Sequence, residues 1–139
     1  MKNPHEIIIK PHITEKSVAA SYGDERSARK RLLNEAKSAP APKKGEKKEL
    51  VTVTDEDLVR KYTFIVADGA NKIEIKAAIE TIYNEGKKPE QAIKVTNVHT
   101  VNLPRKLKRR GRGAAGFTTV RRKAVVTLAK GQMLEEYGV

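Results

Sequence analysis

The stretch from Lys61 to Leu103 constrains the fold most, because it places one well-marked helix between two strands. Side chains alternate in "KYTFIVA", with Tyr62, Phe64 and Val66 on one side and Thr63 and Ile65 on the other. Alternation of this kind predicts a strand. The stretch therefore predicts a sheet with at least one helix packed on it.

The helix in this stretch carries signals at both ends. Asn71 precedes it and Glu74 lies three residues further along, which is the spacing of a capping box. Gly86 follows where the helix should end, and Pro89 lies just beyond. The predicted apolar stripe consists of Ile75, Ala78, Ile79 and Ile82.

Two later strands are predicted to pair as an antiparallel hairpin, because a single loop joins them. The first, "IKVTNVHTVNL" from Ile93 to Leu103, is expected to place Val95 and Val101 on one face. The second, "RKAVVTLA", alternates in the same way. Its expected inner residues, opposite Val125, are Ala124, Val126 and Leu128.

The first twenty residues predict a short strand and a short helix. The strand, "EIIIK" from Glu6 to Lys10, is an apolar run that Pro11 stops. Thr14 is suited to cap a helix that reaches about Ala20, and Glu15 lies in its first turn, where the helix dipole favours an anion. The order strand, helix, strand, helix, strand, strand predicts an α+β fold. We expect a mostly antiparallel sheet with helices on one face and a long basic hairpin loop.

Residues Ser21 to Arg60 interrupt this order, and we interpret them as an inserted segment within a single domain, residues 1–139. In it, "DERSARKRLLNEAK" favours an exposed helix and "ELVTVT" a short strand. The central "SAPAPKKGEKKE" bears prolines and charges without periodicity, which is typical of chain without regular structure. We expect the inserted segment to be dispensable for folding of the rest, because a long surface loop costs little closure entropy.

Residues 105–117, "RKLKRRGRGAAGF", contain the G-x-G-x-x-G spacing of a dinucleotide-binding loop at Gly111, Gly113 and Gly116. Such a loop requires a helix that begins at the glycines and meets the pyrophosphate. Glu135 lies 19 residues after Gly116, near the place of a ribose-binding acid. However, the residues after the glycines predict a strand. An enzyme with a nicotinamide or flavin cofactor is therefore the weaker interpretation.

The stronger interpretation is a basic arm, residues 104–121, that lies along nucleic acid. No acidic residue occurs from Thr100 to Leu134, and the formal net charge of the chain is +12. Lysine and arginine side chains that contact phosphate groups release the counterions condensed on the nucleic acid, and this favours binding. Phe117 is the only aromatic residue of the arm, so we expect recognition of shape, phosphate and 2′-hydroxyl groups. We also expect the arm to be disordered in the free protein and ordered on RNA. The cations in and beside it are Arg105, Lys106, Lys108, Arg109, Arg110, Arg112, Arg121, Arg122 and Lys123.

Other kinds of site have little support. The chain has no cysteine, which excludes disulfides and thiolate chemistry. His5, His12 and His99 are scattered, so we expect no metal site. Nothing resembles H-E-x-x-H or a P-loop, and no nucleophile–base pair is visible, so we expect no cofactor and no enzyme activity. No apolar run approaches the ~18 residues of a membrane span, and the first residues lack the features of a signal peptide. We therefore expect a cytoplasmic protein without direct membrane insertion.

Three groups of residues occur in a telling order, namely "IIIKPHITEKS", "KYTFIVADGANKIEIKAAIE", and "KLKRRGRG" followed by "RRKAVVTLAKGQ". Together they resemble the universal large-subunit ribosomal protein L-twenty-three (L23) family, of bacterial or organellar type. The likeness covers Glu6 to Ala20 and Lys61 to Glu136. The chain departs from the family in its inserted segment, in Arg121 where a tryptophan is frequent, and in His99 where an asparagine is frequent.

The resemblance implies a structural constituent of the ribosome that binds large-subunit ribosomal RNA beside the peptide exit tunnel and contacts neighbouring ribosomal proteins. Arg105 to Arg122 match the loop that reaches toward the tunnel wall. Glu15 in "TEK" matches the acid that docks the ribosome-associated chaperone, trigger factor, and the signal recognition particle and the translocon use the same rim. A free nucleic-acid-binding or antitermination-type module is the alternative. The residues expected to bind ribosomal RNA are Lys10, Lys16, Lys72, Lys76, Arg105, Lys106, Lys108, Arg109, Arg110, Arg112, Arg121, Arg122 and Lys123.

Overall fold

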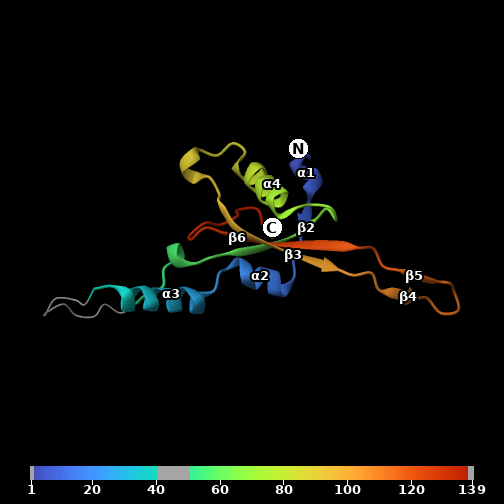
Figure 1. Cartoon of the computed structure of the whole chain (residues 1–139), viewed down its shortest axis with the longest axis horizontal. Helices are drawn as coiled ribbons and strands as arrows, with labels where there is room; N and C mark the ends of the chain where they lie inside the picture. Colours follow the sequence, from blue (N-terminus) through green and yellow to red (C-terminus); the bar gives the residue numbers. More distant parts are fainter. Residues whose placement is uncertain (1, 41–50, 138–139) are drawn as a thin grey trace.

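Four antiparallel strands form the main sheet in the order β1-β2-β6-β3 (Figure 1). They are β1 (Ile8–Pro11), β2 (Lys61–Val66), β6 (Arg121–Leu128) and β3 (Val95–Leu103). The structure is a computed structural model that describes residues 2–40 and 51–137. The predicted α+β fold and the hairpin of the last two long strands are confirmed.

The core lies on one face of the sheet, under the helix α4 (Lys72–Asn84). Tyr62 pairs with Val126, and Val126 pairs in turn with Val98, so these three buried residues form one row across the sheet. The short helix α1 (Pro4–Ile7) packs beside α4. The predicted inner residues of the helix and the last strand are buried, apart from the half-buried Ile82.

The predicted caps of α4 and of α2 (Glu15–Ser21) are confirmed. At α4, the amide of Asn71 donates to Glu74 Oε2 at 2.9 Å, and Asn71 Oδ1 accepts from the next amide at 3.0 Å. At α2, the amide of Ser17 donates to Thr14 Oγ1 at 3.3 Å. Each cap satisfies donors that a helix leaves unpaired at its start.

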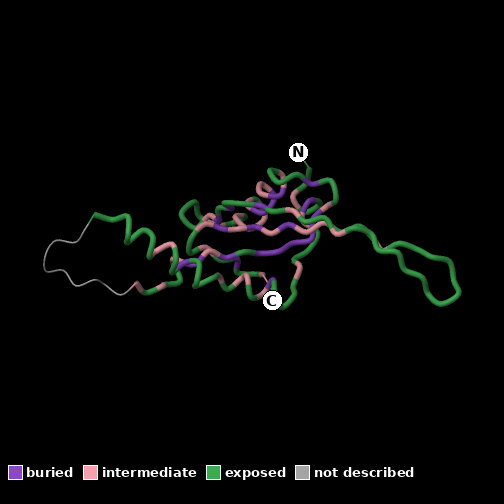
Figure 2. Tube along the Cα trace, turned by 60° about the horizontal axis from the view of Figure 1, so that its bottom comes forward, coloured by how far each residue is buried: buried purple, intermediate pink, exposed green. Residues whose placement is uncertain are grey.

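The helices do not all lie on one face, and this part of the prediction is wrong for α2. It lies across the sheet from α4 (Figure 1) and packs on β2. Both faces of β2 are therefore covered, and its residues Tyr62 to Val66 are all buried (Figure 2). A strand covered on both sides carries apolar residues at successive positions, as in Phe64 and Ile65.

The N-terminal strand begins later than predicted. Residues Pro4–Ile7 form α1, and only Ile8–Pro11 form the strand, so the prediction of a strand from Glu6 to Lys10 is wrong in its first half. Asn3 Oδ1 accepts from the amide of His5 at 3.1 Å, and Pro4 begins the helix. An Asn-Pro pair favours a helix start, because proline has no amide hydrogen to leave unpaired there.

A bulge in β3 makes the prediction that Val95 and Val101 share one face wrong. The register shifts between Val95 and Asn97, so Val98 joins Val95 on the buried face. Val101 is 44% exposed and lies opposite Lys123, on the other face. The extra residue at a bulge reverses the alternation of all later side chains.

The inserted segment contains α3 (Glu25–Ser38), as predicted, and a turn of 3₁₀ helix, η1 (Asp55–Asp57). The strand expected for Glu49 to Thr54 is wrong over residues 51–54, which join no ladder, and its first two residues lie outside the described ranges. Leu58 is only 7% exposed, which makes this end of the inserted segment part of the packed structure.

Another short 3₁₀ turn, η2 (Pro89–Gln91), connects α4 to β3. Among residues 2–40 and 51–137, no helix combines the length and the apolar character needed to cross a membrane.

Candidate nucleic-acid interface

The basic arm is the continuation of β3 and β6 beyond the sheet (Figure 1). What the sequence predicts as a loop contains a second two-stranded ladder, β4 (Leu107–Arg109) and β5 (Ala115–Phe117). At its base the amide of Thr118 donates to the Lys106 carbonyl, and the Lys106 amide donates to Thr118 Oγ1, both at 2.9 Å. A strand thus enters and a strand leaves, and the helix that a dinucleotide-binding loop requires does not begin at these glycines.

The tip of the arm needs two of its glycines. Gly111 has φ +53°, a left-handed conformation that side chains disfavour. A Cβ atom on Gly113 would lie 3.1 Å from the Arg110 carbonyl oxygen, which already accepts from the Gly113 amide. Gly116 pairs with Lys108 and has open space where a side chain would be. The glycine spacing therefore follows from the geometry of a turn.

Every residue of the arm from 104 to 117 is exposed (Figure 2). In the part of the chain that the structure describes, the ion pairs join Lys2 to Glu74 and Arg60 to Asp55, so neither neutralises the arm. Leu107 and Phe117 face each other in the ladder, yet they are 66% and 70% exposed. The arm is thus a cationic rod whose six cations, from Arg105 to Arg112, are all open to a partner.

Where the arm meets the sheet, more basic residues gather on the α2 side. Lys10 and Lys123 both pair with Ile65 from opposite neighbours, which places them on one face. Burial lowers the pKa of His12, and so do the nearby charges of Lys123, Lys10 and Arg121. These four residues form one basic cluster. The sequence suggested no role for His12, although its position two residues after Lys10 was the available signal.

Two further contacts fix the chain around this cluster and set its limit. The hydroxyl of Tyr137 donates to the His12 carbonyl at 2.9 Å and so holds the chain after β1. Arg122 turns to the opposite face, where its Nη1 donates to the Asp68 carbonyl at 2.8 Å. The three successive basic residues of β6 therefore divide between the two faces, with Arg121 and Lys123 on one and Arg122 on the other.

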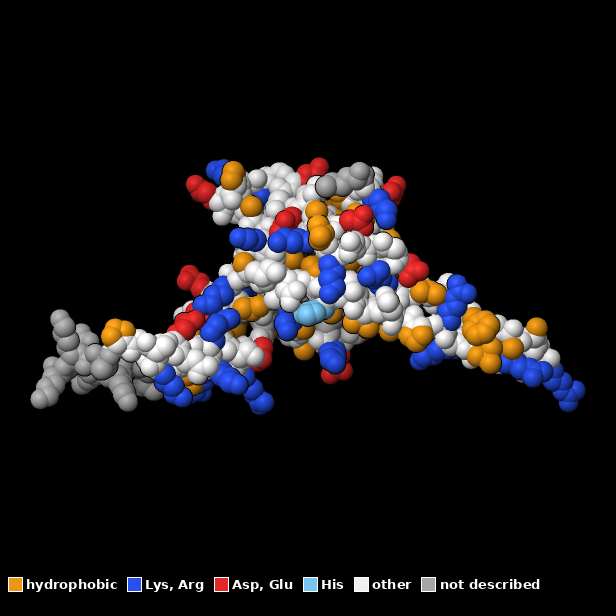
Figure 3. All heavy atoms as spheres, viewed as in Figure 1, with side chains coloured by type: hydrophobic (Ala, Val, Ile, Leu, Met, Phe, Trp, Pro, Cys, Tyr) orange, Lys and Arg blue, Asp and Glu red, His pale blue; other side chains and the backbone are white. Residues whose placement is uncertain are grey.

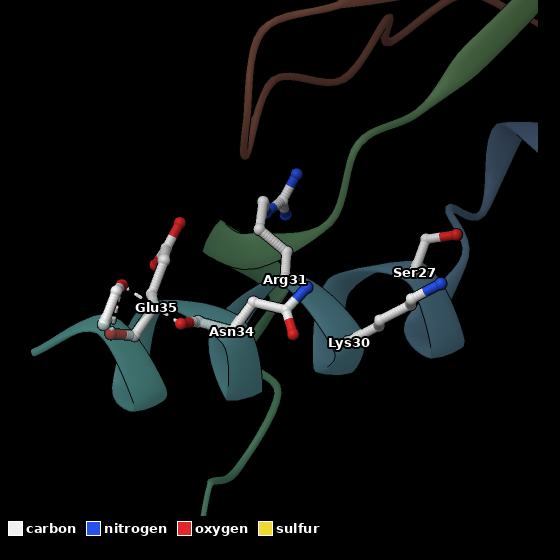
Figure 4. A pocket seen from close by; sticks show the side chains of 6 residues that line it. Ser27, Lys30, Arg31, Asn34 and Glu35 are labelled. Atoms are coloured by element: carbon white, nitrogen blue, oxygen red, sulfur yellow. Dashed lines mark hydrogen bonds between the residues drawn. The ribbon is translucent and has the colours of Figure 1, made fainter.

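The described residues offer little for other chemistry. A groove along α3 is lined by residues of this helix alone, and they include both positively and negatively charged side chains (Figure 4). No group of three side chains suited to a metal ion occurs within residues 2–40 and 51–137. The six residues that line the groove are Ser27, Lys30, Arg31, Asn34, Glu35 and Ser38.

Several protein families combine an α+β fold with a high positive charge, and comparison with known proteins identifies the family of this chain. Residues 41–136 match the model of the family described as Ribosomal protein L23. The chain belongs to this family. Membership confirms the resemblance seen in the sequence and gives this L23-family protein a structural role in the ribosome, in a family that is generally not enzymatic.

Relatives named large ribosomal subunit protein uL23 match the chain over two different lengths. The protein of Heliobacterium modesticaldum is 44% identical over 91 residues, which are 64% of this chain and 86% of the relative. The protein of Bifidobacterium longum (strain DJO10A) is 33% identical over 137 residues, 99% of this chain and 94% of the relative. The longer match extends over almost the whole chain, including the range of the inserted segment.

The remaining predicted sites of the L23-family protein do not lie together. Glu15 and Lys16 are exposed in the first turn of α2. Lys72 is exposed and Lys76 half-buried on α4, across the sheet from α2. The structure thus brings the arm and the basic cluster together and leaves the two α4 lysines apart from them.

Proposed function

We propose that this L23-family protein is a structural constituent of the large ribosomal subunit that binds ribosomal RNA through the basic arm and the basic cluster. The observation that carries this proposal is the arm itself, an exposed hairpin with six cations and no acid. The protein acts in cytoplasmic ribosomes, beside the peptide exit tunnel and next to other large-subunit proteins. No catalytic step belongs to this role.

The arm suits RNA for electrostatic reasons. Each cation that neutralises a phosphate releases a condensed counterion, and this release favours binding at low salt. Arginine presents a planar fork of donors that matches phosphate oxygens. Because Phe117 is the one aromatic side chain on the arm, stacking on unpaired bases contributes little. We therefore infer recognition of the backbone and shape of folded RNA.

A triple substitution tests this role. Lys108, Arg110 and Arg112 make no side-chain hydrogen bond in the described structure, so their change to Gln removes charge without removing a contact. We expect weaker binding to purified large-subunit RNA and a salt dependence whose slope falls by about 2–3, because each phosphate contact contributes roughly 0.9. The matched control is Lys87, Lys88 and Lys94→Gln, near η2. Equal losses in both triples would contradict a specific role of the arm.

Co-sedimentation separates this function from the alternative of a free nucleic-acid-binding or antitermination-type module. A ribosomal constituent remains with large subunits in high salt, because many contacts hold it in place. A free module dissociates as its phosphate contacts are screened. Loss of the chain from large subunits in high salt would favour the free module.

We further propose that Glu15 is part of a docking platform for trigger factor, the signal recognition particle and the translocon. Its carboxylate is exposed at the start of α2, and the two ion pairs of residues 2–40 and 51–137 do not include it. Glu15→Gln should weaken trigger-factor binding to ribosomes, since loss of one partner of a close charge pair costs about 2 kcal/mol or more. Glu25→Gln, at the matching position of α3, is the control. Unchanged chaperone affinity of Glu15→Gln ribosomes would remove this role.

A further inference from the structure

The outer face of α3 is strongly cationic. We define it as Arg26, Arg29, Lys30, Leu33 and Lys37, which fall within an arc of about 100° at 3.6 residues per turn. All five are exposed, while Ala28 on the opposite side is 2% exposed. The two acids of the helix, Glu25 and Glu35, lie outside this arc. Figure 3 shows lysine and arginine side chains gathered along the lower edge of α3.

This arrangement is unfavourable for an isolated helix. Arg26 and Lys30 stand four residues apart, where like charges repel each other across one turn. The carboxylate of Asp24, just before the helix, attracts Arg26 and offsets part of this repulsion. Neither ion pair in residues 2–40 and 51–137 involves α3. An anionic partner along the outer face would reduce the repulsion further.

The helix is also held firmly by the rest of the molecule. Arg31 donates from Nη2 to the Asp57 carbonyl, and Figure 4 shows its side chain rising from α3 toward that segment. At the start of the helix Gly23 has φ +89°, and its Cβ position would lie 3.0 Å from Leu58. The Leu58 carbonyl in turn accepts from the Gly131 amide at 3.0 Å. The outer face is therefore presented in a fixed place, which lowers the entropy cost of binding.

We propose that the outer face of α3 is a second binding surface for the phosphate backbone of double-helical RNA. It lies at the opposite end of the molecule from the basic arm (Figure 1). The inference rests on the proposed function, because the RNA is that of the same subunit, but it uses different residues. Its four cations extend over about 16 Å of straight helix, at 1.5 Å per residue, and so match a row of phosphates.

Two features favour duplex RNA over other partners. The arc contains no aromatic side chain on which an unpaired base could stack. Leu33, at 42% exposed, is its one apolar side chain, whereas the core of a protein–protein interface is apolar and poor in charge. Phosphates of a base-paired helix remain the partner that fits the whole face.

Probing from a single cysteine tests the inference in assembled large subunits, since the chain has no cysteine of its own. Leu33→Cys, carrying a tethered hydroxyl-radical source, should cleave both strands of one ribosomal RNA helix. Ala114→Cys at the arm tip tests the proposed function independently, and Met133→Cys is the exposed control. Cleavage of RNA from residue 114 but not from residue 33 would overturn the proposed role of α3 and leave the proposed function of the arm in place. Failure of the chain to enter large subunits overturns the proposed function.

An affinity measurement gives a second readout. Changing Arg26, Arg29, Lys30 and Lys37 together to Gln should weaken binding of the full chain to a short RNA duplex roughly tenfold or more and lower the salt slope by about 3–4. Arg26→Lys with Arg29→Lys keeps the charge and should retain the affinity. Circular dichroism checks that α3 still forms. Unchanged RNA affinity of the Gln variant, with loss of a neighbouring protein from the subunit, would make this a protein-binding face and overturn the inference.

Discussion

The basic arm and α3 extend from opposite ends of the same sheet, and both are cationic, but they are held in different ways. The arm has no buried residue between 104 and 117, and its hydrogen bonds run mostly within its own hairpin. The α3 helix buries Ala28 and donates from Arg31 to the Asp57 carbonyl, and Gly23, just before the helix, lies against Leu58. The first element depends on its local ladder, and the second depends on packing against the rest of the chain.

This difference has a physical consequence for RNA binding. A two-stranded ladder without a covered apolar face is only marginally stable in water. If the arm binds RNA as proposed, it should gain most of its order there, and its affinity should include the cost of that ordering. The α3 helix is ordered beforehand and should bind without this cost. Four experiments test the contrast, beginning with the largest expected effect.

Amide hydrogen exchange should separate the two elements most clearly. Without RNA, the amides of Lys106 to Gly116 should open with a free energy near zero, and those of the middle of α3 should require several kcal/mol more. Adding large-subunit RNA should slow exchange in the arm and change α3 much less. Strong protection of the arm in the free protein would show that its ladder is stable by itself.

A pair of leucines tests the same contrast through stability. Leu58 is 7% exposed and Leu107 is 66% exposed. Leu58→Ala should lower the free energy of unfolding by about 2–4 kcal/mol, because it leaves a cavity. Leu107→Ala, the same change on the arm, should stay within about 0.5 kcal/mol. Urea denaturation measures both, and equal losses would mean that the arm packs on the sheet in solution.

Replacing residues 24–54 with a short Gly/Ser link asks how far the sheet depends on α3. The structure refines the hypothesis that the whole inserted segment is dispensable, because Leu58 and Arg60 are buried and should be kept. With these retained, thermal unfolding should shift by a few degrees, equivalent to about 1 kcal/mol. A much larger shift would show that α3 is part of the cooperative core.

The pKa of His12 gives the smallest and most local effect. The folded state lowers this pKa, so the free protein should lose a little stability as the pH falls below about 6.5, where the unfolded chain takes up the proton. Phosphates bound at the basic cluster should raise the pKa instead. Proton NMR of the His12 ring should show this rise with RNA. It should persist in the α3 Gln variant, and a rise that requires the α3 cations would contradict separate surfaces.

Much of the fold could be predicted from the sequence, because its periodic elements are marked locally. Asn71, Glu74 and Gly86 define the ends of α4 through bonds and conformations within a few residues. The inner face of β6 follows from alternation alone, whereas the burial of both faces of β2 does not. The basic arm was visible as a run of one charge, although its short ladder was not predicted.

The rest depends on contacts that local patterns do not encode. The bulge at Thr96 exchanges the faces of Val98 and Val101, and a single extra residue is invisible in a strand with apolar residues on both sides. The position of α2 depends on which face of β2 remains uncovered. His12 joins the basic cluster only because the register brings Lys123 near it. The outer face of α3 could not be predicted, because the spacing of its basic residues shows which side faces outward only once Ala28 is known to face inward.

The central place of β6 affects how the molecule carries mechanical load. The arm joins β3 and β6 at the same end, so a pull on its tip draws both strands in one direction. The ladder between β6 and β2, from Lys61↔Thr127 to Val66↔Arg122, is then loaded in shear, and its hydrogen bonds share the force. A pull across the sheet would open the same ladder one pair at a time. We therefore expect rupture at a higher force along the strands than across them, a difference that single-molecule pulling in the two directions would measure.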